Sequence, residues 1–395
     1  MKMIERRLQP VCESDLLSFP ILTLTGPRQS GKSTLLKSML SDWRYVNLEE
    51  PSVLDFATED PKGFIKTYSD RVVFDEIQRA PKLLSYIQVE VDRDRRPSRF
   101  ALTGSHNLSL LQQVSQSLAG RTSIRHLLPF SYFELKNNDW AHDSLEKNLF
   151  FGGYPPVYHY PEAATVWFDS YIQTYIERDV RMIRNVNDLS AFRRFVRLCA
   201  GRAGQLLDLS GLGADTGISH NTARDWVGVL EAGFITFRLE PYFKNFSKRL
   251  IKSPKIYFYD TGILCRLLDI KSPEELELSP FRGAVFENWC VAETLKAYYH
   301  QGLQPGLYFW RDQKIEVDMI LTLSANKGIA VECKSGVTPA SDALNAPNEL
   351  KRISKDPNFS PVAIFGGDNS QKRSNGDLLS WTDFAKALGK TDLGF

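Results

Sequence analysis

The 395-residue chain lacks the cysteine patterns that mark two large classes of protein. Its five cysteines are odd in number and scattered, and none has the CxxC or Cys/His spacing of a metal site. This argues against a disulfide framework and against a cysteine-based metal centre. We expect reduced thiols with packing roles in the cytosol.

Long apolar runs are also missing. The first seven residues, MKMIERR, do not contain the apolar stretch of a secretory signal. No run approaches the roughly 20 apolar residues that a helix needs to cross a bilayer. The sequence therefore predicts a soluble, cytoplasmic protein with no membrane partner.

The chain carries almost no excess of charge of either sign. Its 49 Lys and Arg against 47 Asp and Glu leave a net charge of +2, which is too small to identify a partner. Residues 190–256 are the basic part, with eleven Lys and Arg against five Asp and Glu. Any nucleic-acid surface must therefore be a local patch. The length predicts two or three domains.

A complete phosphate-binding motif, GxxxxGK[ST], occupies residues 26–34. The apolar run 21–25 precedes it and a helix-forming stretch follows, so a strand leads through a glycine-rich turn into a helix. The N–H groups of such a turn bind a triphosphate, Lys32 reaches the β and γ phosphates, and Ser33 can bind Mg²⁺. The residues predicted to bind ATP here are Gly26, Pro27, Arg28, Gln29, Ser30, Gly31, Lys32, Ser33 and Thr34.

A second motif of an ATPase follows the apolar run 71–74, which ends in Asp75 and Glu76. In this Walker B pattern Asp75 holds Mg²⁺ and Glu76 polarises the attacking water. The next strand-like run ends in Ser105, which can orient the same water. Short strands alternate with helices throughout this part. That order predicts an α/β fold with a parallel sheet and with ligands at the carboxyl ends of its strands.

Arg121 closes a helix immediately before the strand-like run 122–128. In an oligomeric ATPase an arginine at this place can enter the neighbouring subunit's site and stabilise charge in the transition state. The alternative is a helix-terminal arginine that interacts favourably with the helix dipole. Both interpretations stay open.

A cluster of helix breakers at residues 151–156 predicts the passage out of the ATPase domain, whose end we place at residue 150. Residues 191–239 then have the pattern of a winged helix-turn-helix. The start of its predicted recognition helix carries His220, Asn221 and Arg224, which can reach DNA base edges or phosphates.

Basic residues interleaved with aromatics follow along the predicted wing, and Lys248, Arg249 and Lys252 are the ones expected at DNA phosphates. Winged helices also dock proteins, so either kind of partner fits this segment.

The last third of the chain predicts the order αβββαβ. The elements are a helix at 284–299, strands at 307–311, 315–321 and 328–334, a partly helical stretch, and a strand at 361–365. This order is the core arrangement of the PD-(D/E)xK nuclease superfamily, which the segment resembles.

Four residues of this part fall where the resemblance expects a site. Asp318 lies in the second strand, and Glu332 and Lys334 share one face of the third because side chains alternate along a strand. Glu287 comes from the helix. Glu287, Asp318 and Glu332 can hold Mg²⁺ or Mn²⁺, and Lys334 can activate water. The alternative is a buried ion-pair network in a fold that has lost its activity.

Together these motifs resemble a prokaryotic family of AAA+ ATPases with a C-terminal domain of unknown function. The resemblance covers nearly the whole chain. It implies an ATPase domain at 1–150, a helical linker and winged helix at 151–275, and a nuclease-like domain at 276–395. Membership of the AAA+ class also implies a hexameric ring with active sites at the subunit junctions.

The leading functional hypothesis is an ATP-hydrolysing DNA motor or remodeller with a metal-dependent nuclease, acting on duplex or branched DNA. The rival is a nucleotide-gated switch that docks a protein and keeps the nuclease-like fold as an inactive scaffold. A third hypothesis is a transcriptional regulator that uses the winged helix.

Overall fold

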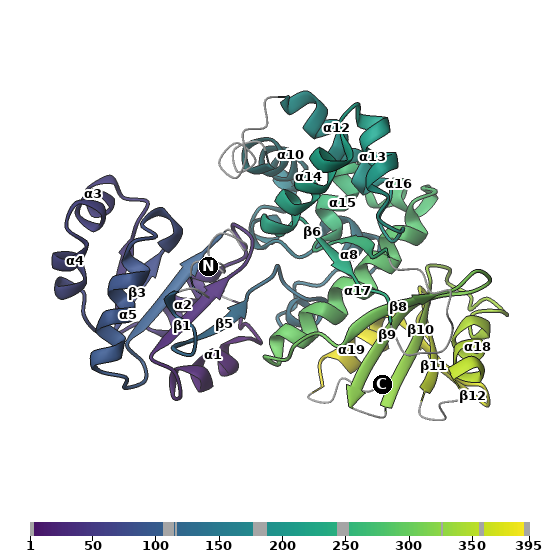
Figure 1. Cartoon of the computed structure of the whole chain (residues 1–395). Helices are drawn as coiled ribbons and strands as arrows, with labels where there is room; N and C mark the ends of the chain where they lie inside the picture. The colour runs from purple at the N-terminus through teal and green to yellow at the C-terminus, as the bar shows by residue number, and fades with distance from the viewer. Residues whose placement is uncertain are drawn as a thin grey trace. The chain divides into compact units, whose positions relative to one another are not determined.

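The computed structural model describes residues 4–105, 114, 117–176, 188–242, 253–324, 327–354 and 359–390. The chain forms two compact units (Figure 1). The first comprises Met1–Pro129, Glu231–Phe234 and Tyr299–Leu303, and the second Phe130–Leu230, Ile235–Tyr298 and Gln304–Phe395. Within the described part of the chain, no helix is long and apolar enough to span a membrane.

The first unit is built on a five-stranded, all-parallel sheet with the strand order β2-β3-β4-β1-β5. Its strands are β1 (Ile21–Thr25), β2 (Arg44–Asn47), β3 (Val72–Asp75), β4 (Phe100–Gly104) and β5 (Thr122–His126). The predicted α/β class with a parallel sheet is confirmed. The carboxyl ends of parallel strands share one edge, so the phosphate loop after β1 and the acidic end of β3 lie at the same edge.

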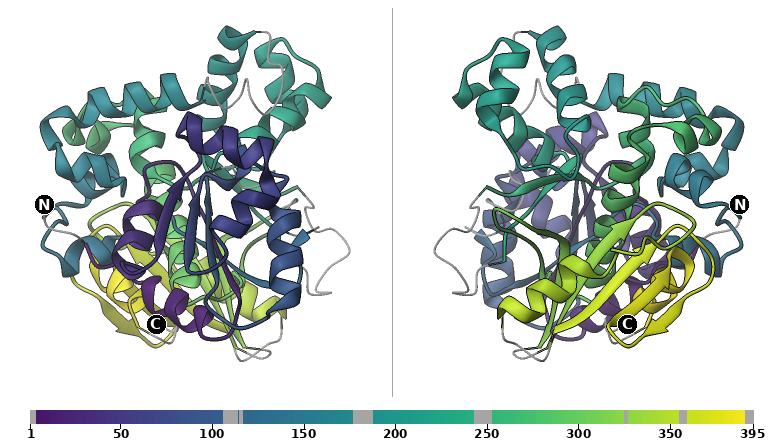
Figure 2. Two further views of the ribbon diagram at one scale, coloured as in Figure 1. Left: turned by 90° about the vertical axis from the view of Figure 1, so that its left-hand side faces the viewer. Right: turned by 90° about the vertical axis from the view of Figure 1, so that its right-hand side faces the viewer.

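Side chains alternate along each strand, so the apolar residues of these strands point to both faces of the sheet. Helices cover both faces and bury these residues. Leu22, Leu24 and Val73 pack against α1 (Gln9–Leu16) and α2 (Lys32–Met39). Ile21 and Phe74 pack on the other face, against α3 (Pro51–Glu59), α4 (Pro61–Thr67) and α5 (Leu83–Arg93). The result is a three-layer unit, seen from the side in Figure 2.

The second unit begins with short helices. They are α7 (Tyr132–Asn137), α8 (Leu145–Phe151), α9 (Pro155–His159) and α10 (Ala164–Tyr171), and α10 continues into a π-helical turn at Ile172–Ile176. The helix predicted over 166–186 is present as far as residue 176, and its remainder lies outside the described residues.

The middle of the second unit contains three helices and a two-stranded antiparallel sheet. They are α12 (Leu189–Ala200), α13 (Leu209–Thr216), α14 (His220–Ala232), β6 (Thr236–Leu239) and β7 (Lys255–Phe258). Trp226 of α14 packs edge-on against Phe192 and Phe195 of α12, which fixes the two helices together. The short helices α15 (Thr261–Leu267) and α16 (Pro273–Leu278) follow.

The end of the chain has the predicted succession of helix, three strands, helix and strand. These are α17 (Arg282–His300), β8 (Leu307–Arg311), β9 (Glu316–Ser324), β10 (Lys327–Lys334), α18 (Asn345–Ser354) and β11 (Phe359–Phe365). Three elements that were not predicted extend it: β12 (Gln371–Arg373), β13 (Gly376–Ser380) and α19 (Trp381–Leu388). The six-stranded sheet has the order β12-β13-β11-β10-β9-β8.

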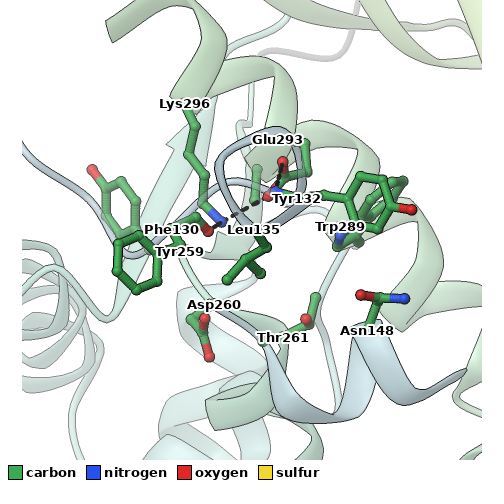
Figure 3. Close-up of a pocket in the computed structure, with 12 residues that line it drawn as sticks. Phe130, Tyr132, Leu135, Asn148, Tyr259, Asp260, Thr261, Trp289, Glu293 and Lys296 are labelled. Carbon is green, nitrogen blue, oxygen red and sulfur yellow. Dashed lines mark hydrogen bonds and ion pairs between the residues drawn. The ribbon is translucent and has the colours of Figure 1, made fainter. Parts of the chain in front are cut away.

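The first continuous stretch of the first unit ends at Pro129, before the boundary at residue 150, which stays a prediction. Buried Glu293 and Lys296 of α17 bind the segment that follows: Glu293 accepts a hydrogen bond from the backbone N–H of Tyr132 at 2.8 Å. Lys296 donates to the carbonyl of Phe130 at 3.0 Å. The four residues of these two hydrogen bonds are among those that line a small pocket (Figure 3). Residues 130–150 are therefore part of the second unit.

The boundary at residue 275 lies within the second compact unit, and it also stays a prediction. Lys255 and Tyr257 of β7 donate hydrogen bonds to Glu287 of α17. These polar contacts join the middle part of the unit to α17.

Candidate functional site

The phosphate loop has the backbone that its glycines permit. Gly26 and Gly31 adopt φ values of +150° and +97°, which disfavour other residues. A Cβ atom on Gly26 would lie 2.1 Å from the carbonyl oxygen of Leu127, so only glycine fits there. Gln29 also has a positive φ, Ser30 is buried, Arg28 is half-buried and Thr34 is exposed.

Lys32 is buried inside the loop. Its ammonium group donates to the carbonyl oxygens of Gly26 at 2.9 Å and Pro27 at 2.8 Å. Burial lowers the pKa of Lys32 to about 8, while Glu76 and Asp75 oppose that shift. The loop thus holds a positive charge where a phosphate group would bring negative charge.

Arg6, which the sequence did not point to, braces the loop from outside. Its guanidinium donates to the carbonyl of Ser30 and to that of Leu128, each at 2.7 Å. An arginine close to the chain's start carries no motif, so only the three-dimensional contact identifies it.

Asp75 accepts hydrogen bonds from side chains of three elements, the helix α2 and the strands β2 and β4. Ser33 Oγ donates to its Oδ2 atom at 2.9 Å, and the hydroxyls of Tyr45 and Thr103 donate to the same carboxylate. Burial and the hydrogen bond to Asp75 raise the pKa of Tyr45. Tyr45 was not predicted, although it lies in the strand next to β3.

A Mg²⁺ ion fits the donors at this edge, because a serine hydroxyl and a carboxylate already lie side by side and hard cations take oxygen ligands. Ser33 and Asp75 would hold the ion, which would neutralise phosphate charge when bound.

Glu76 follows Asp75 in the left-handed backbone region, at φ +57°. Its Oε2 atom accepts hydrogen bonds from Gln78 Nε2 and from Ser105 Oγ, the latter at 3.1 Å. The predicted pair of Glu76 and Ser105 is thus brought together across the ends of β3 and β4. Gln78 is an addition that the sequence did not indicate.

Arg121 lies in the first unit in an ion pair. Its guanidinium makes a two-pronged contact with Asp92, at 2.9 Å from Nε and 2.7 Å from Nη2, and it also donates to the carbonyl of Ala119. The structure therefore places Arg121 in a contact within its own chain, and Asp92 was not part of the prediction.

The predicted recognition helix is α14. Ser219 caps it, since its hydroxyl accepts from the N–H of Thr222 at 3.1 Å. His220, Asn221 and Arg224 are all exposed on its first turns. Lys248, Arg249 and Lys252 lie outside the described residues.

The four residues of the predicted nuclease site gather in the second unit, joined by a lysine from another element. Lys255 of β7, only 1% exposed, lies 3.0 Å from Glu287 Oε1 and 3.9 Å from Asp318 Oδ1, and it also pairs with Glu316. Lys334 pairs with Glu332 at 2.7 Å. We call Lys255, Glu287, Glu316, Asp318 and Glu332 the carboxylate cluster.

The crowding of carboxylates shifts their protonation. Burial, and then the neighbouring Glu287 and Glu332, raise the pKa of Asp318 well above its ordinary value. Burial raises the pKa of Glu332 although Lys334 lowers it. Burial alone would lower the pKa of Lys255, but the surrounding carboxylates outweigh it and raise that pKa.

A divalent ion does not fit this arrangement as the structure has it. The ammonium of Lys255 lies within ion-pair distance of Glu287 and Asp318, two of the three carboxylates that were expected to hold the metal. Among the residues that the structure describes, no three His, Cys, Asp or Glu side chains are arranged to bind a metal. The metal site predicted at Glu287, Asp318 and Glu332 stays a prediction; in this structure Lys255 is the cation next to Glu287 and Asp318, and Lys334 is the cation next to Glu332.

Two members of the cluster, Glu316 and Lys255, and the adjoining Tyr257 were not predicted as part of this site. Glu316 has the same alternation as Asp318, two positions away, and could have been found from it. Lys255 and Tyr257 also alternate on one strand, and a lysine at the start of the apolar run 256–259 was a weak signal. Their pairing with a distant helix leaves no mark in the sequence.

Comparison with known protein families divides the chain into three matches. Residues 18–136 match an AAA domain, and residues 142–274 and 282–384 match two domains of unknown function, DUF8612 and DUF4143. The AAA match contains the phosphate loop and the Asp75 and Glu76 pair. It ends close to the border between the two compact units.

Similar proteins include the uncharacterized proteins Rv2008c of Mycobacterium tuberculosis and Mb2031c of Mycobacterium bovis. Each is 33% identical over 327 residues, which cover 81% of this chain and 71% of the relative. Among solved structures, the Walker-type ATPase PABY2304 of Pyrococcus abyssi aligns with a TM-score of 0.48 and 14% identity, over 67% of this chain and 96% of that one. The chain belongs, with the two mycobacterial proteins, to a family of prokaryotic AAA ATPases that carry a C-terminal domain of unknown function.

Proposed function

We propose that the chain binds and hydrolyses ATP at the carboxyl edge of the parallel sheet. The main observation behind this proposal is the hydrogen bond of 2.9 Å from Ser33 Oγ to Asp75 Oδ2, next to the buried Lys32 of the phosphate loop. Lys32 binds the β and γ phosphates, and Ser33 and Asp75 bind Mg²⁺. Glu76, held by Ser105 and Gln78, orients and deprotonates the attacking water.

We further propose that DNA is the partner that hydrolysis acts on, as duplex or branched DNA. The support is the capped helix α14 with His220, Asn221 and Arg224 exposed at its start, after two helices and before an antiparallel pair of strands. That arrangement is typical of a winged helix, in which the second helix of the motif enters the major groove.

A nucleotide-gated switch is the second candidate function. Lys255 in the carboxylate cluster favours it, because a lysine at that position opposes the metal-dependent cleavage proposed for Asp318, Glu332 and Lys334. In this hypothesis α14 docks a protein and the C-terminal sheet is a scaffold.

Assembly into a hexameric ring is part of both proposals. Arg121 would leave Asp92 and reach the γ-phosphate bound by the adjacent subunit, since the charge of an arginine stabilises the transition state of phosphoryl transfer.

ATP turnover with and without DNA distinguishes the two functions. Linear, forked and four-way DNA should raise the turnover rate of the wild type, and Arg224→Ala should reduce that increase while leaving the rate without DNA unchanged. Turnover that no DNA alters would favour the switch. A wild-type protein that binds ATP without hydrolysing it would contradict the motor, and one that does not bind ATP would contradict both. The matched control is Arg238→Ala, an exposed arginine on β6 of the same part.

A further inference from the structure

The carboxylate cluster brings together more negative groups than a buried region normally tolerates. Glu287, Asp318 and Glu332 are 18%, 13% and 13% exposed in their side chains, and Glu316 adjoins them at 29%. Buried carboxylates need a cation or hydrogen bonds, because transfer of an unpaired charge out of water is costly.

Three cations pair with the carboxylates of the cluster, one at its centre and two at its exposed edge, which we call the rim. Lys334 is 38% exposed and pairs only with Glu332 among the described ion pairs, and Arg311 is 41% exposed and pairs with Glu316 at 3.0 Å. Lys255 is 1% exposed and lies within ion-pair distance of three carboxylates. Lys255 is therefore the central cation.

The hydrogen bonds around the centre leave little freedom for another occupant. The ammonium of a lysine has three N–H donors, and three carboxylates surround that of Lys255. Glu287 Oε1 also accepts from the hydroxyl of Tyr257 at 2.6 Å, and Asp318 Oδ2 accepts from the backbone N–H of Cys333 at 2.8 Å. These oxygens of Glu287 and Asp318 are thus already hydrogen-bonded, whereas Glu332 Oε2 is buried without a hydrogen-bond partner.

We propose that Lys255 is the built-in cation of this cluster, so that the cluster is an ion lock that joins β7 to α17 and β9 and needs no divalent metal. The lock connects the hairpin that follows the proposed DNA-contact helix to the C-terminal sheet. It thereby makes the two parts of the second unit one body, in agreement with the absence of a division at residue 275.

The test measures the thermal midpoint Tm of the nucleotide-free, full-length protein by calorimetry, with EDTA or with Mn²⁺. Mn²⁺ should leave the wild-type Tm unchanged. Lys255→Met should lower the Tm of the second unit by roughly 10 °C, because it strips the cation from a buried cluster. Lys334→Met is the matched control at the rim and should lower it by less than about 2 °C.

A double-mutant cycle separates lost charge from lost packing. Lys255→Met combined with Glu287→Gln should be more stable than the sum of the two single losses predicts, because the second change removes a carboxylate left without its cation. Additive losses would overturn the ion lock.

A wild-type Tm that rises with Mn²⁺, with the rise abolished by Asp318→Asn, would also overturn the proposal. If Lys255→Met does not fold, Mn²⁺ titration of the wild type by calorimetry decides: no binding supports the lock, and binding that Asp318→Asn abolishes contradicts it.

Discussion

The hydroxyl of Ser33 lies 2.9 Å from the carboxylate of Asp75, although 42 positions separate the two residues. Ser33 is the second residue of α2, which follows β1 and the phosphate loop. Asp75 is the last residue of β3, which lies two places from β1 in the sheet. The parallel arrangement brings them to one edge. This pair is the proposed site of Mg²⁺.

Ser33→Ala should therefore weaken the binding of Mg²⁺-ATP by about tenfold or more, the free-energy equivalent of one lost ligand contact. Binding in the presence of EDTA should change little, because the alanine removes a metal ligand and no phosphate contact. Titration with a fluorescent ATP analogue measures both. Ser38→Ala, an exposed serine on the same helix, is the control. Equal losses with and without Mg²⁺ would remove Ser33 from its role.

Arg121 and Asp92 give a test of assembly. Arg121→Ala and Lys32→Ala should each abolish most ATP turnover, and a mixture of the two should regain part of it, because each subunit supplies the half-site that the other lacks. A coupled phosphate-release assay measures the mixture.

Asp92→Ala is the matched control, since it removes the same ion pair and keeps the arginine. If Arg121 acts only through this pair, Asp92→Ala and Arg121→Ala will behave alike and no mixture will recover activity.

His126 predicts how the stability of the first unit depends on pH. Burial, with a smaller effect of Arg125, lowers the pKa of His126 from 6.5 to about 4. Between these values the unfolded chain binds a proton that the folded chain does not, so stability falls as the pH falls through this window. The loss should reach about 3 kcal/mol in the free energy of unfolding near pH 4.

His126→Asn keeps a hydrogen-bonding partner for Thr25, which lies 2.7 Å from His126 Nδ1, and removes the titration. Urea unfolding across the window should then show a shallower dependence on pH. His220→Asn, an exposed histidine, should retain the wild-type dependence. An unchanged slope in His126→Asn would show that another group dominates.

Salt should weaken DNA binding steeply if the basic segment contacts phosphates. Neutralising Lys248, Arg249 and Lys252 together should flatten the slope of log affinity against log salt by roughly 2 to 3. Fluorescence anisotropy with a labelled duplex measures the slope. Lys62→Ala with Lys66→Ala, exposed on α4, is the control. An unchanged slope in the triple variant would show that DNA phosphates contact other residues.

Local sequence patterns predicted most of the strands and site residues of the first unit. The apolar runs before Gly26 and Asp75 predicted β1 and β3, and the motifs at their ends predicted the residues of the nucleotide site. These signals are local because a few consecutive residues are enough to predict a buried strand and the residues at its end. The contact of Arg6 with Ser30 is not local, so the sequence could not indicate it.

The second unit shows the opposite case. Alternation along β10 correctly predicted that Glu332 and Lys334 lie on one face of the strand. It could not indicate that Lys255 is the cation that pairs with the other carboxylates. Lys255 reaches Glu287 through packing between a hairpin and a helix, and such pairings depend on the whole fold. For the same reason, the helix breakers near residue 150 could not indicate that residues 130 and 132 form hydrogen bonds with Lys296 and Glu293 of α17.

The most direct test of ATP hydrolysis is the turnover of Glu76→Gln beside Lys32→Ala. Glu76→Gln should bind ATP as the wild type does and hydrolyse it at least about a hundredfold more slowly, because it lacks the base that activates water. Lys32→Ala should not bind ATP, and Glu59→Gln, an exposed glutamate of α3, should behave as the wild type. Wild-type turnover by Glu76→Gln would contradict the proposed active site.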